Sequence, residues 1–196
     1  MSVRLFGQET EYAYSVLDAE GKSMLRERPA WDLVVRAGRL APHLCCGPTD
    51  LFFPWGRLYV DCGAHPEFST AECADPSELV RMALAGESML ITATDAIARA
   101  MDVGSVFLTR CNVDYWDNAC ATWGCHESYM HAGRFDMARQ IIPHLASRPV
   151  ITGAGGFDTI TPGSVPKYMN SPRVAHLRKV SSQSSTSERG IFHTKN

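Results

Sequence analysis

The sequence has little that points to a membrane, a nucleic acid or secretion. No apolar run reaches the length needed to cross a bilayer, and Met1 is not followed by a charged and then apolar signal segment. The formal net charge of -2 offers no basic surface to nucleic acid or to anionic lipid. We therefore expect a cytoplasmic protein with no membrane contact and no nucleic-acid partner.

The common signatures of zinc and of phosphate loops are also missing. The seven cysteines contain no CxxC pair, so no zinc site is predicted, and an odd number without a secretory signal favours reduced thiols. The glycine-rich stretch Val150–Phe157 has neither a Walker lysine nor the full GxGxxG spacing. With 196 residues and a hydrophobic fraction of 45%, the chain is nevertheless long enough for one sizeable globular domain.

Most of the residues that could carry chemistry lie in one stretch, RLYVDCGAHPEFSTAEC, which is Arg57–Cys73. Alternation of polar and apolar residues predicts a strand over 57–61, a turn at 62–64 and a second strand over 67–72. On the first strand, side chains two apart share a face, and that face carries Arg57, Tyr59 and Asp61. Spacing alone leaves two interpretations open, a functional site and a surface hairpin with solvated charges.

The N-terminal stretch VRLFGQETEY predicts another strand, over 3–12. Glu9 and Glu11 share one of its faces, where their charges repel each other. A divalent cation such as magnesium would remove that repulsion, because hard cations take oxygen ligands. The alternative is an exposed strand whose acidic face meets water.

The remaining pattern alternates helices, strands and loops. Asp75 and Pro76 are typical of a helix start, and we expect that helix to run from Pro76 to about Met101. Two further helices are predicted, over 31–40 and over 134–146, and the second is interrupted near Pro143. Strands are predicted over 105–112 and 123–130, and a strand followed by a loop over 150–157. Loops are predicted over 41–54 and 181–187. His126 in the 123–130 strand is interpreted as a structural histidine.

Five motifs, taken together, resemble one known family. They are GQETEY at Gly7–Tyr12, GRLYVDCGAHPEFSTAEC at Gly56–Cys73, GCHESYM at Gly124–Met130, RPVITGAG at Arg148–Gly155 and SPRVAHL at Ser171–Leu177. In this order they resemble the Pup ligase and depupylase (Pup deamidase) family of actinobacteria, which is similar to carboxylate-amine ligases of the glutamine-synthetase type. The resemblance implies an α+β fold, with a curved antiparallel sheet as a cradle and helices packed behind it.

The resemblance also implies roles for six residues. Glu9, Tyr59 and Glu67 match magnesium-binding positions, Arg57 and Thr70 match nucleotide-binding positions, and Asp61 matches the catalytic aspartate. The implied cofactors are Mg²⁺ and ATP, or ADP and phosphate, and the implied partner is Pup or a Pup-like small protein or peptide.

Two departures from the family affect the predicted function. Family members are more than twice this long, and here the chain stops at Asn196. The chain is therefore expected to be the N-terminal portion (1–196) of a catalytic domain that a C-terminal fragment of the same gene product completes, pairing beside an otherwise unpaired strand at Ile191-Phe192. Asn196 would then be a self-processing site.

Three functions remain open on these grounds. The preferred hypothesis is a depupylase-like amide hydrolase, because of the chain end. The alternative, which the motifs DCGAHPE, STAEC and GCHE favour locally, is an ATP-dependent ligase that joins a carboxylate to a lysine amine. The third is an inactive binding subunit.

Overall fold

The computed structural model describes residues 4–24, 29–40, 45–47, 50–101, 103–110, 113–115, 122–131, 134, 136–158, 165, 167–184 and 188–193. The chain divides into two compact units. The first is made of Met1–Arg110 and Trp123–Ala132, and the second of Cys111–Thr122 and Gly133–Asn196.

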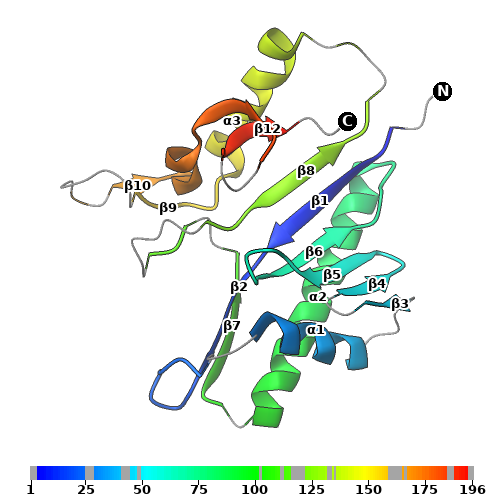
Figure 1. Cartoon of the computed structure of the whole chain (residues 1–196), viewed down its shortest axis with the longest axis vertical. Helices are drawn as coiled ribbons and strands as arrows, with labels where there is room; N and C mark the ends of the chain where they lie inside the picture. The colour runs from blue at the N-terminus through cyan, green and yellow to red at the C-terminus, as the bar shows by residue number, and fades with distance from the viewer. Residues whose placement is uncertain are drawn as a thin grey trace. The chain divides into compact units, whose positions relative to one another are not determined.

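A six-stranded antiparallel sheet forms the centre of the first unit (Figure 1). Its order is β3-β4-β5-β6-β1-β8, so the N-terminal strand lies inside the sheet rather than at its edge. The strands are β3 (Cys45–Cys46), β4 (Asp50–Phe53), β5 (Gly56–Val60), β6 (Pro66–Thr70), β1 (Phe6–Glu11) and β8 (Cys125–Tyr129). A separate antiparallel pair joins β2 (Ala13–Leu17) to β7 (Ser105–Thr109).

One face of this sheet is apolar and is covered by two helices, α1 (Pro29–Leu40) and α2 (Pro76–Met101). The sheet contributes Leu51, Phe53, Leu58 and Phe68 to the core, and the helices contribute Leu33, Val34, Ala37, Met89, Leu90, Ala93 and Ile97. Because side chains alternate along a strand, burying these residues sends their neighbours to the opposite face. The helices thus determine which face of the sheet is left for polar residues.

Helix α2 begins as the sequence predicts. The carboxylate of Asp75 accepts hydrogen bonds from the backbone N–H groups of Ser77 (2.8 Å) and Glu78 (2.9 Å), and the carboxylate of Glu78 accepts one from Ala74 N–H (2.9 Å). Such reciprocal capping satisfies N–H groups that have no partner within the helix. Further along, a Cβ at Gly86 would lie 2.4 Å from the ring of Phe68, so glycine lets this helix pack directly on β6.

The segment 41–54, predicted as a loop, contains β3 and β4 among its described residues, so that prediction is wrong. Its prolines and glycine suggested a loop, but β4 pairs with β5 from Asp50↔Tyr59 to Phe53↔Gly56 and buries Leu51 and Phe53. Tertiary pairing decides strand formation more strongly than composition does. The other predicted elements of this unit are present, with ends that differ by a few residues.

The second unit consists of short elements: η1 (Met137–Ile141), α3 (Ile142–Thr152), β9 (Gly156–Phe157) paired with β10 (Tyr168–Met169), η2 (Pro172–His176), and β11 (Lys179–Ser182) paired in parallel with β12 (Gly190–His193).

Three predictions for the second unit are corrected. Pro143 lies in the first turn of α3, where proline is tolerated, rather than interrupting a helix. Val150 and Ile151 end α3 instead of forming a strand, because their β-branched preference needs a partner strand to be expressed. The run Ile191-Phe192 forms part of β12, which pairs with β11 along one side, and so it is not an unpaired strand. Of the predicted loop 181–187, residues 185–187 lie outside the described part of the chain.

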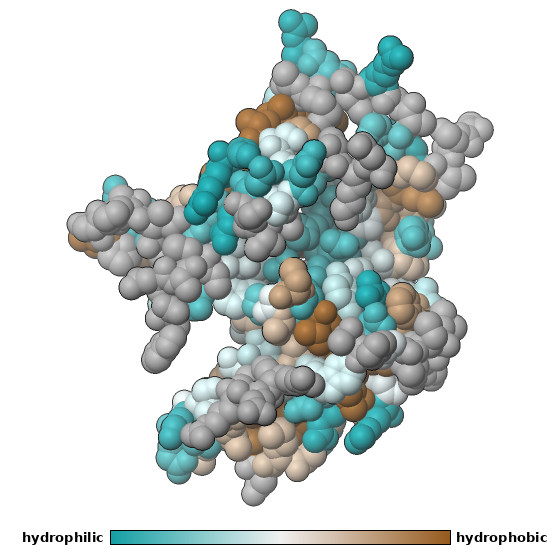
Figure 2. All heavy atoms as spheres, viewed as in Figure 1, coloured by the Kyte–Doolittle hydropathy of each residue, from teal (hydrophilic) through white to brown (hydrophobic). Residues whose placement is uncertain are grey.

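Among the described residues, no helix is both long enough and apolar enough to span a bilayer. On the face drawn in Figure 2, hydrophobic residues form small separate patches among hydrophilic ones. This distribution agrees with the mean hydropathy of -0.14.

Candidate functional site

Two rows of polar side chains cross the sheet on the face away from the helices. The strand register aligns the first row as Arg57, Ser69, Glu9 and His126. It aligns the second row, one step along the strands, as Tyr59, Glu67 and Glu11. Since paired residues on neighbouring strands share a face, four strands present these groups to one surface.

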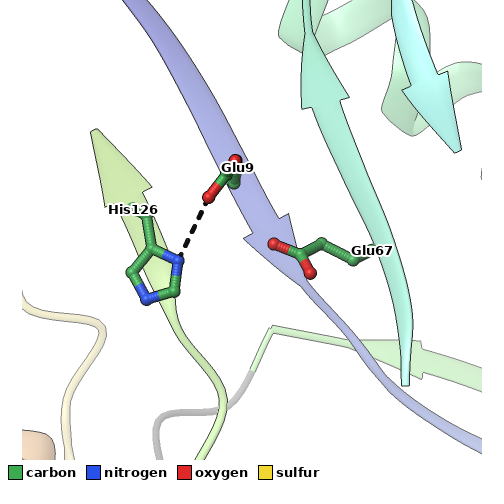
Figure 3. A group of neighbouring side chains, drawn as sticks. All are labelled: Glu9, Glu67 and His126. Atoms are coloured by element: carbon green, nitrogen blue, oxygen red, sulfur yellow. Dashed lines mark ion pairs between the residues drawn. The ribbon is translucent and has the colours of Figure 1, made fainter. Parts of the chain in front are cut away.

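Two carboxylates and an imidazole converge in the middle of this surface. Glu9 on β1, Glu67 on β6 and His126 on β8 each offer one ligand atom, and these atoms lie within 4.8 Å of one another. Nδ1 of His126 is 3.3 Å from a carboxylate oxygen of Glu9, and the Glu67 carboxylate turns toward β1 (Figure 3). The predicted convergence of Glu9 and Glu67 is therefore confirmed, while their role as metal ligands stays a prediction.

The Glu67 carboxylate is buried beside other acidic groups of the two rows. Its residue is only 5% exposed. The pKa of Glu67 is raised from 4.5 to about 7, mainly by burial and also by the charges of Glu11 and Glu9, against a lowering hydrogen bond from Tyr59. The ionised form of Glu67 is thus disfavoured beside Glu9 and Glu11, and a bound cation would reduce the repulsion among these carboxylates.

Tyr59 lies directly across from Glu67 and is kept protonated. Burial raises the pKa of the Tyr59 phenol well above its ordinary value, and the charges of Glu67 and Glu9 add to that, against the hydrogen bond from Ser69. The Ser69 hydroxyl donates to Tyr59 Oη at 3.2 Å. Without a metal ion the Tyr59 phenol is therefore neutral, and its predicted role as a ligand stays a prediction.

Arg57 stands at the edge of the first row, between aromatic rings and an acid. Its guanidinium carbon lies 4.3 Å from the ring centre of Tyr59 and 5.2 Å from that of Phe52. One terminal nitrogen contacts the carboxylate of Asp50 at 2.6 Å, while Nε is buried with no hydrogen-bond partner among the described residues. These contacts position the guanidinium, and the 41% exposure of the Arg57 side chain leaves part of it accessible to a phosphate oxygen.

Asp61 lies one residue beyond the end of β5, in the turn that leads to β6. Its Oδ1 accepts the backbone N–H of His65 at 2.7 Å. Asp61, His65 and Glu11 form a second group whose ligand atoms lie within 4.8 Å of one another. Asp61 therefore adjoins the second row of the polar face, as its strand parity predicts, and its catalytic role remains to be tested.

Thr70 is not brought to the same surface. It pairs with Gly56 and alternates with Ser69, which places its side chain on the helix side of β6. Its hydroxyl accepts the backbone N–H of Gln8 at 3.1 Å. The structure thus gives the Thr70 side chain a partner within the sheet, and its nucleotide-binding role stays a prediction.

Sequence reasoning missed one member of the central group. His126 was interpreted as structural because Glu127 points to the opposite face of the predicted strand, which leaves a lone histidine on its own face. The register of β8 against β1 pairs His126 with Glu9 and Glu127 with Gln8, so only the histidine reaches the polar face. The motif GCHE was a usable signal, but the pairing that gives it meaning joins strands more than a hundred residues apart in the sequence.

Comparison with known proteins assigns the family. The Pup-ligase protein family matches residues 49–196, which includes β5, β6 and the turn between them. The chain belongs to the Pup-ligase family. A Pup–protein ligase of Geodermatophilus obscurus is 34% identical over 206 residues, with 100% of this chain and 43% of that protein covered. Those of Kocuria rhizophila and Corynebacterium glutamicum are each 32% identical, with 100% and 98% of this chain and 44% and 41% of those proteins covered.

A solved structure agrees with the family assignment. The crystal structure of the complex between the prokaryotic ubiquitin-like protein Pup and its ligase PafA superimposes with a TM-score of 0.70 at 27% identity, covering 94% of this chain and 36% of that chain. This match confirms the predicted α+β fold of the glutamine-synthetase-like superfamily. The chain spans less than half the length of the Pup–protein ligases that it matches.

Proposed function

We propose that this chain carries the metal, nucleotide and proton-transfer groups of an ATP-dependent Pup-type ligase, which joins a carboxylate to a lysine amine. The observation that carries the proposal is the polar face of the sheet, where Glu9, Glu67 and His126 converge beside Arg57. Carboxylates, an arginine and an aspartate on one surface suit phosphoryl transfer followed by amine attack. The named function of the relatives supports the same chemistry.

The residues present fit a magnesium ion. Glu9 and Glu67 supply hard oxygen ligands. Burial, with the charges of Glu11 and Glu9, raises the pKa of Glu67, so a cation beside it would favour the ionised carboxylate. His126 can complete the group or orient Glu9, to which it lies 3.3 Å away. Glu9 and Glu67 would hold the ion, which would supply positive charge to offset the negative charge that develops on phosphate oxygens.

Arg57 is proposed to bind the nucleotide phosphates. Its guanidinium carbon lies 4.3 Å from the ring centre of Tyr59 and the group pairs with Asp50, so little side-chain freedom is lost when a phosphate binds. The Arg57 side chain is 41% exposed, so the accessible part of its guanidinium can meet a phosphate.

Asp61 is proposed to act as the base. In the ligation step, a lysine nitrogen attacks the carbonyl carbon of the phosphorylated carboxylate. The C–N bond forms, the C–O bond to phosphate breaks, and the proton from the amine goes to Asp61. Asp61 adjoins the polar face that holds the other groups, and its Oδ1 is already fixed by a backbone N–H.

The comparisons favour the ligase over the preferred sequence-based hypothesis of an amide hydrolase. The relatives reported above are named Pup–protein ligases, and none of them is named as a hydrolase or a depupylase. Amide hydrolysis and self-cleavage after Asn196 therefore have no support, and the ligase replaces them as the proposed activity. The acidic groups present also speak against an inactive binding subunit.

The test has two parts, one that measures nucleotide binding and one that distinguishes ligation from hydrolysis. In calorimetry, ADP should bind this chain only when Mg²⁺ is present, and Arg57→Ala should weaken that binding, while His144→Asn, an exposed substitution on α3, should not. With Pup, a lysine-containing protein and ATP, the protein from its natural gene should form a conjugate whose mass is the sum of the two substrates less one water. Asp61→Asn should abolish conjugation and leave ADP binding intact.

Two results would contradict the proposal. One is release of Pup from a purified conjugate without any conjugation under the same conditions, which would restore the hydrolase. The other is ADP binding that ignores both Mg²⁺ and Arg57→Ala, which would remove the proposed nucleotide site.

The C-terminal fragment predicted from the sequence stays a proposal. A tagged form of this chain, expressed from the complete gene, should co-purify with the remainder of the gene product. Recovery of a single uncut product would end the two-piece proposal.

A further inference from the structure

The turn that carries Asp61 is closed by three hydrogen bonds. Asp61 N–H donates to the His65 carbonyl at 3.0 Å, Ala64 N–H donates to the Asp61 carbonyl at 3.0 Å, and His65 N–H donates to Asp61 Oδ1 at 2.7 Å. The closed turn places Ala64 at φ of 61°, in the left-handed region that non-glycine residues seldom adopt. Backbone held in such a conformation is concentrated at functional sites.

The imidazole of His65 is fixed on the other side of the same carboxylate. Its ring centre lies 5.2 Å from that of Trp123, with an angle of 47° between the ring planes. A Cβ at Gly63 would lie 2.9 Å from the imidazole Nδ1, so the absence of a side chain there leaves the space that the ring fills. Trp123 and Gly63 together hold the ring beside Asp61.

The nitrogen that faces Asp61 lacks a partner. Nδ1 of His65 is buried and makes no hydrogen bond among the described residues, although it lies 3.8 Å from Asp61 Oδ2. That distance exceeds a hydrogen bond, and a buried polar atom without a partner is costly. Hydrogen bonds of catalytic groups are often long in ligand-free structures and shorten in the complex with substrate.

We propose that His65 is a positioning residue for Asp61, resting on the proposed role of Asp61 as the base. The backbone N–H of His65 holds Oδ1, and the imidazole Nδ1–H directs Oδ2, so that both oxygens of the carboxylate are set by one residue. A lone pair of Oδ2 that the imidazole does not use then remains to accept the amine proton. A ligand that orders the turn shortens the contact between Nδ1 and Oδ2 to a hydrogen bond.

A purely structural role for His65 makes a different prediction. If the ring serves only to pack on Trp123 and support the turn, any side chain of similar size should replace it. If the donor at Nδ1 is needed, only a side chain with an N–H at that position should replace histidine. Asparagine places its amide nitrogen close to the position of Nδ1, whereas leucine fills the space without a donor.

The experiment compares His65→Leu with His65→Asn in the protein expressed from its natural gene. We expect His65→Leu to lower kcat for conjugation by about 10-fold to 100-fold, the range found for groups that orient a reacting residue through one hydrogen bond. KM for ATP and the thermal midpoint Tm should stay close to the wild-type values. His65→Asn should recover most of kcat, and His144→Asn should change none of these quantities.

Gly63→Ala tests the geometry of the same turn, because its new methyl group would lie 2.9 Å from the imidazole Nδ1 and 3.2 Å from Asp61 Oδ2 without altering any donor. It should lower kcat in the way that His65→Leu does. Equal losses in His65→Asn and His65→Leu, or a loss of kcat that follows Tm across the variants, would overturn the inference.

The Asp61→Asn variant separates this inference from the proposed function. If Asp61→Asn still conjugates, the base assignment is wrong and the positioning role goes with it. If Asp61→Asn is inactive while His65→Leu and Gly63→Ala turn over normally, the base assignment stands and only the positioning role fails.

Discussion

Tyr59 and Glu67 face each other across β5 and β6, and burial favours the protonated form of both. A phenol and a carboxyl in facing positions form one hydrogen-bonded pair in the sheet. Because Glu9 and Glu11 lie on the neighbouring strand, their charges further disfavour ionisation of Glu67. The stability of the metal-free protein should therefore depend on the protonation of Glu67.

The first prediction concerns pH. Between about pH 4.5 and about pH 7, Glu67 keeps its proton in the folded state, whereas an unfolded chain has lost it. The unfolded state then binds fewer protons, so the free energy of unfolding should fall as the pH rises through this window. The loss should reach roughly 3 kcal/mol above pH 7. Urea unfolding of the metal-free protein at several pH values measures it.

Glu67→Gln provides the matched comparison for this pH dependence. It should flatten the decline and make the metal-free protein more stable than wild type at neutral pH. Glu20→Gln, at an exposed position in a turn, should leave the decline unchanged. A decline of the same size in Glu67→Gln would show that another group is responsible.

The second prediction concerns magnesium. Adding Mg²⁺ to wild type at neutral pH should raise the Tm, since an ion that binds only the folded state stabilises it by about 2.7 kcal/mol at one hundred times its Kd. Glu9→Gln and Glu67→Gln should each remove most of this increase, because each replaces a charged oxygen ligand with a neutral one. Calcium and magnesium titrations followed by thermal unfolding give the measurement, and an unchanged response in both variants would rule out this metal site.

The third prediction concerns the geometry of Arg57. Arg57→Lys keeps the positive charge but removes the flat fork that stacks on Tyr59 and pairs with Asp50. We expect ADP affinity in the presence of Mg²⁺ to fall by about tenfold, which is about 1.4 kcal/mol. Arg110→Lys, whose exposed side chain pairs with Glu87 away from the polar face, is the control. Equal affinity in Arg57→Lys and wild type would mean that charge alone is used.

The fourth prediction concerns His176 in the second unit. The Arg189 guanidinium can only donate, so its contact at 3.2 Å makes His176 Nδ1 an acceptor and puts the proton of the neutral ring on Nε2. Burial lowers the pKa of His176, and the charges of Arg189, Arg173 and Arg178 lower it further. An unfolded chain therefore takes up this proton first, and stability should be lost as the pH falls below about 6.5.

His176→Gln is the comparison for that acid sensitivity, because glutamine keeps an acceptor and does not titrate. The urea concentration at the midpoint of unfolding should change less between pH 5.5 and pH 7.5 in His176→Gln than in wild type. His144→Gln, at an exposed site on α3, should behave as wild type. If His176→Gln keeps the full acid sensitivity of wild type, the destabilising proton is taken up elsewhere.

The parts of the site that sequence analysis predicted are those set by local geometry. The shared face of Arg57 and Tyr59 follows from the period of a strand, and so does the shared face of Glu9 and Glu11. The start of α2 follows from Asp75 and Pro76, whose capping groups act within four residues. Patterns of this kind need no knowledge of the rest of the chain.

The parts that were missed depend on pairing between distant segments. His126 reaches Glu9 only because β8 lies beside β1 in one particular register. Thr70 was grouped with Arg57 by family resemblance, although alternation along β6 turns its side chain to the helix side. The short strand Asp50–Phe53 is stabilised by β5 and by the helices rather than by its own composition.

The alternation of buried and polar faces along β1, β5 and β6 restricts how this chain can vary in evolution. Insertion or deletion of a single residue inside one of these strands would exchange its two faces, moving Glu67 among the helices and Phe68 into water. Substitutions can accumulate one at a time, but a change of length here removes the core and the site together. Length variation among homologues should therefore gather in the connections, and an alignment gap within Gly56–Val60 or Pro66–Thr70 would indicate a misalignment or a chain that has lost its chemistry.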